Sequence, residues 1–228
     1  MTMTAKELLE AYKEEDFFSM YQLRGADLTG ADLSGANLTG ADLIKANFTG
    51  ANLSGADFSR AILIRANLSK ASLIGANLSG AILIGVDFTD TNLTGANLSG
   101  AILIGAYLEN TSLTKANLSK AILIGAYMSY ANFTDTNLTG ADFTKANFTE
   151  ANFTKASLIG ANLTEARIYE TTLTKANLSG AILIGTYIID TNLAGANLSG
   201  AIMRQTTIRG ANLTGAVLPE DYIIDPTE

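Results

Sequence analysis

A five-residue period runs through this chain without a break, and it limits what the chain can fold into. Every fifth residue from Leu28 to Leu218 is apolar, and these 39 positions hold 27 Leu, 7 Phe, 3 Ile and 2 Met. The residue two places earlier is Ala in 31 of the 39 repeats, and all 21 glycines stand at positions divisible by five. A period of five fits neither an α-helix, with 3.6 residues per turn, nor a flat strand, with a period of two. It fits a chain that turns a corner after every fifth residue.

The pattern also predicts which side chains point inward. In an extended segment the first and third residues lie on the same side, so the Ala and Leu positions would both face a core. The fifth residue, often Gly, would form the corner. The variant Ala-Ile-Leu-Ile begins at residues 61, 81, 101, 121 and 181, always a multiple of twenty apart. The sequence therefore predicts a square coil of four repeats, in which residues twenty apart stack in a column.

The run from Ala26 to Gly40 consists of three units of the form Ala-(Asp/Asn)-Leu-X-X. This unit resembles that of the pentapeptide-repeat family, and the resemblance extends over about 195 of the 228 residues. It implies an all-β protein, a right-handed quadrilateral parallel β-helix of about ten coils over residues 21–218. The resemblance does not imply one particular activity, because the fold serves several roles.

Both ends of such a solenoid need a cap, since an open coil exposes unpaired backbone groups. Thr4 and Glu7 have the spacing of a helix capping box, and apolar residues follow them. We therefore expect a short N-terminal capping helix within residues 1–20. At the other end Pro219 breaks the repeat, and Tyr222 to Ile224 could fold over the last coil. Residues 219–228 are accordingly expected to form a C-terminal cap or tail.

Composition excludes several kinds of chemistry. The chain contains no Cys, His or Trp, which removes disulfides, Cys or His nucleophiles, and zinc sites with nitrogen or sulfur ligands. The net charge of −7 comes from the ends, since residues 1–20 carry −3 and residues 219–228 carry −4. The neutral body has no basic footprint for nucleic acid, and no apolar run is long enough to span a bilayer. We expect no enzymatic activity, no cofactor, no direct nucleic-acid binding and no membrane contact, and we expect a cytoplasmic protein.

One column of acidic residues has the side-chain type that metal sites use. Glu150, Glu170 and Asp190 are twenty residues apart and would stack on one corner. A hard cation such as calcium prefers such ligands. A solvated acidic column is the favoured interpretation, so we expect no metal site.

One departure from the repeat points to function. Outward positions are usually Asn, Asp, Ser or Thr, but on one side of four successive coils both outward residues are Ile. We call this set the isoleucine face: Ile62, Ile64, Ile82, Ile84, Ile102, Ile104, Ile122 and Ile124. Tyr107 and Tyr127 fall at outward positions on the adjoining side. Eight exposed Ile side chains would offer roughly 500–800 Å² of apolar surface, as much as the largest patch of an ordinary monomer.

These residues predict a protein contact with a partner that the sequence does not identify. A homodimer, through the isoleucine face or the C-terminal segment, is one expected form. The leading functional class is a non-enzymatic scaffold that presents flat faces to another protein. A DNA-mimicking gyrase-binding protein, known in the family that the chain resembles, is the alternative, although the neutral body does not favour it. An ice-binding protein is a minor alternative, and its regular Thr columns are missing here.

Overall fold

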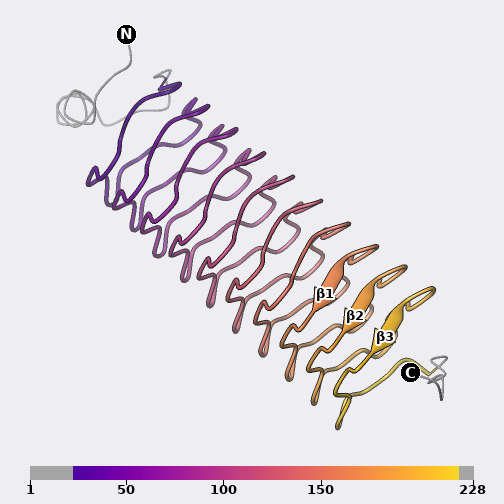
Figure 1. Ribbon diagram of the computed structural model, residues 1–228. Coiled ribbons are helices and arrows are strands. Elements are labelled where there is room, and N and C mark those ends of the chain that lie inside the picture. The colour runs from indigo at the N-terminus through magenta and orange to yellow at the C-terminus, as the bar shows by residue number, and fades with distance from the viewer. Residues whose placement is uncertain (1–22, 221–228) are drawn as a thin grey trace.

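The computed structural model describes residues 23–220, and the chain winds through them in similar coils that stack into a rod (Figure 1). Residues twenty apart are joined by parallel bridges, for example Ile62 to Ile82 and Ile82 to Ile102. Near the C-terminal end the pairing widens into three short strands, β1 (Arg167–Tyr169), β2 (Tyr187–Ile189) and β3 (Thr207–Arg209). They form one parallel sheet in the order β1-β2-β3. The predicted twenty-residue coil of parallel β-structure is therefore confirmed.

The backbone hydrogen bonds explain why the period holds. Each third residue donates its N–H to the next coil, as Leu98 does to the Asn117 carbonyl at 2.7 Å. Each second residue donates to the preceding coil, as Asn97 does to the Ala76 carbonyl at 2.9 Å. Every repeat between the first and last described coils thus bonds to both neighbouring coils, and a single inserted residue would break this register.

The corners are tight turns with a left-handed residue at the fifth position. Ala101 N–H donates to the Leu98 carbonyl at 3.1 Å across such a turn, and Gly100 has a φ of 64°. A positive φ at the third of four turn residues, with no positive φ at the second, is the pattern of a type II turn. The predicted corner is confirmed, but glycine is not required there. Lys115 and Tyr130 adopt φ values of 60° and 62° in equivalent corners.

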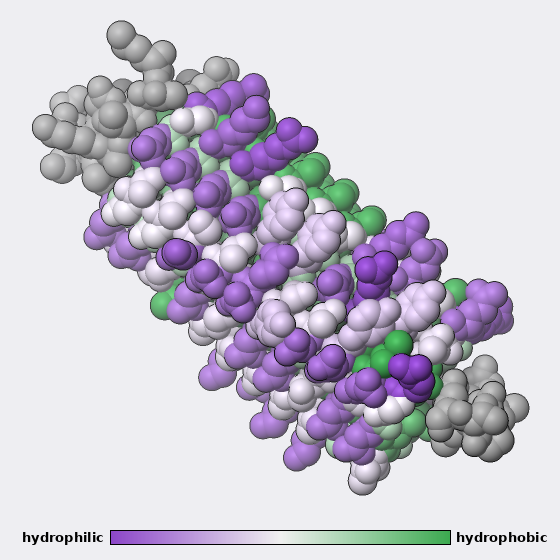
Figure 2. Space-filling view, in the orientation of Figure 1, coloured by the Kyte–Doolittle hydropathy of each residue, from purple (hydrophilic) through white to green (hydrophobic). Residues whose placement is uncertain are grey.

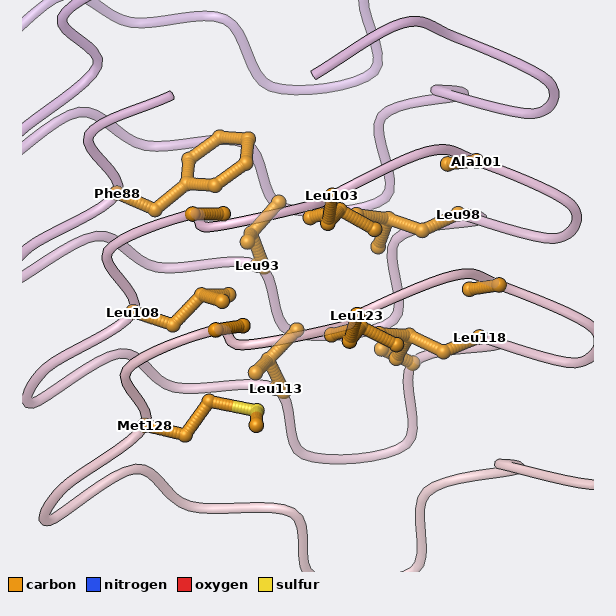
Figure 3. Packing of buried hydrophobic residues seen from close by; sticks show 14 of the residues in the cluster. Phe88, Leu93, Leu98, Ala101, Leu103, Leu108, Leu113, Leu118, Leu123 and Met128 are labelled. Carbon is orange, nitrogen blue, oxygen red and sulfur yellow. The ribbon is translucent and has the colours of Figure 1, made fainter. Parts of the chain in front are cut away.

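The core is a continuous apolar column along the rod. Leu98, Leu103, Leu118 and Leu123 all point into the coil interior and stack on the next layer (Figure 3). The predicted inward positions are thereby confirmed. Seven of the inward positions are Phe, and the rings of Phe133 and Phe153 stack with centroids 4.5 Å apart.

Threonine replaces alanine at several inward positions, and its hydroxyl is satisfied inside the rod. Thr111 is buried, and its Oγ1 donates to the Phe88 carbonyl at 2.7 Å. Thr91, Thr136 and Thr171 make the same contact with the preceding coil. Within residues 23–220 no buried side-chain nitrogen or oxygen lacks a hydrogen-bond partner. The core therefore tolerates threonine because each hydroxyl ties two coils together.

The expected N-terminal capping helix of residues 1–20 lies outside the described residues, and so do Tyr222 to Ile224 of the expected C-terminal cap. In the part of the chain that the structure describes, no helix is long and apolar enough to cross a membrane.

Candidate interaction surface

The isoleucine face lies on one side of the rod, as the period predicted. None of its eight side chains belongs to the buried core. Ile84 and Ile104 are the most open, with 37% and 39% of their surface exposed, while the other six are half-buried. Each Ile stacks on its counterpart one coil away, so the face offers less apolar area than eight free side chains would. What remains is a flat, two-column apolar strip.

Carboxylates close one column of the strip, from Ile62 to Ile122, at both ends. Asp42 precedes it and forms an ion pair with Arg24 at 2.7 Å. Asp142 follows it, and its Oδ1 accepts hydrogen bonds from the Thr144 backbone N–H at 3.0 Å and from the Asn162 amide at 3.2 Å. The second column continues to Ile44 in the preceding coil, so both columns are apolar together over the four coils from Ile62 to Ile124.

Two tyrosines extend the apolar surface around a corner. The rings of Tyr107 and Tyr127 are stacked, with centroids 5.4 Å apart and planes 8° from parallel, and each residue is 46% exposed. Gly105 forms the corner between Ile104 and Tyr107, so no side chain separates them. The structure thus brings the predicted tyrosines beside the isoleucine face. Figure 2 shows green hydrophobic side chains gathered along one edge of an otherwise mostly hydrophilic side.

Sequence reasoning missed the charges that border the strip. Arg60, Arg65 and Lys120 occupy its two corner columns and are exposed. We call these three residues the basic rim. Between residues 60 and 125 the other corner positions on these columns are glycines, namely Gly80, Gly85, Gly100, Gly105 and Gly125. Sorting the fifth residues by their place in the twenty-residue coil would have revealed the rim.

The side that precedes the isoleucine face is polar and bonded to itself. Amide Nδ2 groups donate to the Oδ1 of the preceding coil from Asn77 to Asp57 at 3.1 Å and from Asn97 to Asn77 at 3.3 Å. Partial burial raises the pKa of Asp57, but hydrogen bonds from Ser59 and Asn77 outweigh this effect and hold the pKa below its usual value. The ladder leaves few free groups for a ligand, since its members already bond to one another.

The acidic column was the other site candidate. Glu150, Glu170 and Asp190 occupy successive corners with φ values of 58°, 53° and 51°. Tyr130 precedes them, and its hydrogen bond to Glu150 raises the pKa of the Tyr130 hydroxyl. Among residues 23–220 no three acidic side chains converge closely enough to hold a metal ion.

The stacked coils, the inward Ala and Leu columns and the type II corners define a β-helical solenoid. Matches to the family described as pentapeptide repeats occur in eight copies, at residues 22–60, 51–90, 61–100, 91–129, 101–140, 131–168, 141–180 and 181–218. The chain belongs to the pentapeptide-repeat family. Proteins of this family form right-handed β-helices, in agreement with the handedness expected from the resemblance.

Solved structures of the same kind were also found. HetL, a pentapeptide repeat protein involved in heterocyst differentiation regulation in the cyanobacterium Nostoc sp. strain PCC 7120, is 31% identical. The match covers 97% of this chain and 99% of that chain, with a TM-score of 0.39. A pentapeptide repeat protein from the Arabidopsis thaliana thylakoid lumen is 36% identical over 51% of this chain and 68% of that chain, with a TM-score of 0.34. QnrB1, a plasmid-mediated fluoroquinolone resistance protein, is 21% identical over 84% of this chain and 90% of that chain, also with a TM-score of 0.34. A comparison with curated proteins gave no significant match.

Proposed function

We propose that this protein is a non-enzymatic scaffold that binds another protein through the isoleucine face and the adjoining tyrosine pair. One observation carries the proposal: outward positions are apolar in both columns of four successive coils, where the repeat otherwise places polar residues. Membership of a family of repeat scaffolds supports it. Aromatic side chains beside an apolar strip are typical of the residues that dominate binding energy at interfaces.

The backbone supports a rigid binding surface. Each coil is hydrogen-bonded to both neighbours, and the five-residue phase leaves no room for a projecting loop between residues 23 and 220. A surface that is ordered before binding loses little conformational entropy when the partner docks. The flat strip is therefore suited to a partner that also presents an extended, regular surface.

The charge of the rod does not support DNA mimicry. Residues 23–220 carry 14 acids and 13 bases, whereas a duplex mimic needs a dense array of negative charge. Catalysis is not part of the proposal, because the chain has no His or Cys and Leu and Ala fill the coil interior. A supercoiling assay with gyrase would separate the DNA-mimic alternative from the scaffold.

The paired change Ile84→Asp with Ile104→Asp tests the proposed face. Both side chains point outward, so the β-helix circular dichroism spectrum and most of the stability should remain. Removing two carboxylates from water in an apolar interface has a large free-energy cost. Binding of a partner from an extract of the native cell should therefore be lost, and so should any dimer seen by light scattering.

A matched control exists on the other sides of the rod. Ile74 and Ile159 are as exposed as Ile84 and Ile104 but lie outside the isoleucine face. Ile74→Asp with Ile159→Asp should leave partner binding unchanged. The proposal is wrong if both pairs of changes affect binding equally, or if the unmodified protein binds nothing through this face.

A further inference from the structure

The corner columns on the two long sides of the isoleucine face carry positive charge alone, whereas Asp42 and Asp142 lie at its ends. Along the two corner columns that flank it, between residues 60 and 125, the charged residues are the basic rim: Arg60, Arg65 and Lys120. Arg60 and Lys120 lie on one edge of the strip and Arg65 lies on the other. An occupant of the strip therefore meets cations on both sides.

The two arginine side chains of the basic rim extend along the rod toward the next coil, and the rim residues form no ion pair within residues 23–220. A β-carbon placed on Gly85 would lie 3.6 Å from Cγ of Arg65, and one placed on Gly80 would lie 4.0 Å from Cγ of Arg60. Each arginine stem thus covers the glycine corner of the next coil, beside Ile82 and Ile84. Within residues 23–220 the ion pairs shorter than 4.0 Å are Arg24–Asp42 and Lys145–Glu165, so no rim residue has an anionic partner.

This arrangement disfavours a symmetric dimer through the isoleucine face. If two copies pair in antiparallel fashion, the same edges meet, and Arg60 lies opposite Lys120 of the second copy. If the two rods pair in parallel about a two-fold axis, one edge of a coil meets the opposite edge of the same coil in the second copy. Arg60 of one copy then lies opposite Arg65 of the other. Both two-fold pairings bring like charges together around an apolar centre.

We propose that the partner surface is an acidic amphipathic helix, with an apolar stripe that covers the isoleucine columns and with Asp or Glu on both flanks. The inference rests on the proposed function and specifies the chemistry of its partner. Four coils at a strand-like spacing of ~4.8 Å span roughly 15 Å, which a helix of about ten to twelve residues matches at 1.5 Å per residue. Apolar residues at i, i+3, i+4 and i+7 would contact both Ile columns, and the flanking carboxylates would reach the three cations.

Two synthetic peptides test this chemistry. Each is a fourteen-residue acetylated peptide with Leu at i, i+3, i+4 and i+7, as described above. One carries Glu at the flanking positions, and the other carries Lys at the same positions. Fluorescence anisotropy with the full-length chain should show the Glu peptide binding at least about tenfold more tightly than the Lys peptide, because three exposed ion pairs together are worth about that factor. Added salt should reduce the difference.

Variants of the chain distinguish the inference from the proposed function. Arg60→Glu, Arg65→Glu and Lys120→Glu combined should reverse the preference between the peptides, while the remote pair Lys155→Glu and Lys175→Glu should not. Ile84→Asp with Ile104→Asp should remove binding of both peptides.

Three results would overturn the inference. Equal affinity for both peptides, lost only with the isoleucine changes, would refute the acidic partner while the proposed face stands. Failure of both peptides together with an isoleucine-dependent dimer of the parent would make a second copy the occupant. Binding that ignores both the rim and the isoleucine changes would refute the acidic helix and the proposed face together.

Discussion

Leu98→Asp is expected to destabilise the protein by roughly 5 kcal/mol or more. Leu98 is fully buried, and its side chain points into a column of other leucines, so no partner is available for a carboxylate (Figure 3). Because each coil of a solenoid is stabilised by its neighbours, the damage should spread along the rod. Thermal unfolding followed by circular dichroism would measure the effect.

Ser99→Asp is the matched control for this prediction. It introduces the same charge one residue further on, at a position that faces outward. Its melting temperature should stay close to that of the parent. A Leu98→Asp protein that melts within about two degrees of the parent would contradict the inward assignment, since even 1 kcal/mol shifts the midpoint by about 2–4 °C in a chain of this size.

Phe148→Ala is expected to cost about 3–5 kcal/mol. The Phe148 ring packs edge-on against Phe143 and Phe153, with centroid distances of 5.1 and 5.0 Å. Below these rings the core changes to smaller side chains such as Ile168 and Leu173, and a small apolar void lies at the step. Removing the ring would join a new cavity to that void, and the rigid coils could close it only in part.

Urea unfolding would compare this variant with Phe148→Leu. Leucine occupies 27 of the 39 central inward positions of the repeat, so Phe148→Leu should cost less than about 1.5 kcal/mol. Equal losses for the two variants would contradict this expectation, because leucine would then recover none of the stability that the ring contributes.

The sequence was sufficient to predict the coil because each pentapeptide contains every kind of position that one side of the coil needs. One repeat contains its inward Ala and Leu, its outward pair and its corner, so the positions of Leu98 and Gly100 follow from a five-residue pattern. The twenty-residue recurrence of Ala-Ile-Leu-Ile then placed the isoleucine face on one side. In each repeat the local preferences for inward, outward and corner residues agree with the fold of the whole rod. Such agreement makes the fold predictable from the sequence.

Features that depend on contacts between coils could not be predicted in the same way. The hydrogen bond from Thr111 to Phe88 spans 23 residues. Tyr130 has a φ of 62°, a left-handed conformation that its residue type does not favour. The partial burial of Ile62 likewise comes from stacking on Ile82. The basic rim was visible only after the corners had been sorted by coil position.

Thiol labelling at two adjacent residues tests the central claim, that the isoleucine face points outward from a filled core. The chain has no cysteine, so Ile104→Cys and Leu103→Cys each provide a single thiol. Ile104 is 39% exposed and Leu103 is fully buried. Ile104→Cys should react with a maleimide in the folded protein at nearly the rate of a free thiol, and Leu103→Cys should react only after denaturation. Equal rates in the folded state, or faster labelling of Leu103→Cys, would contradict the account.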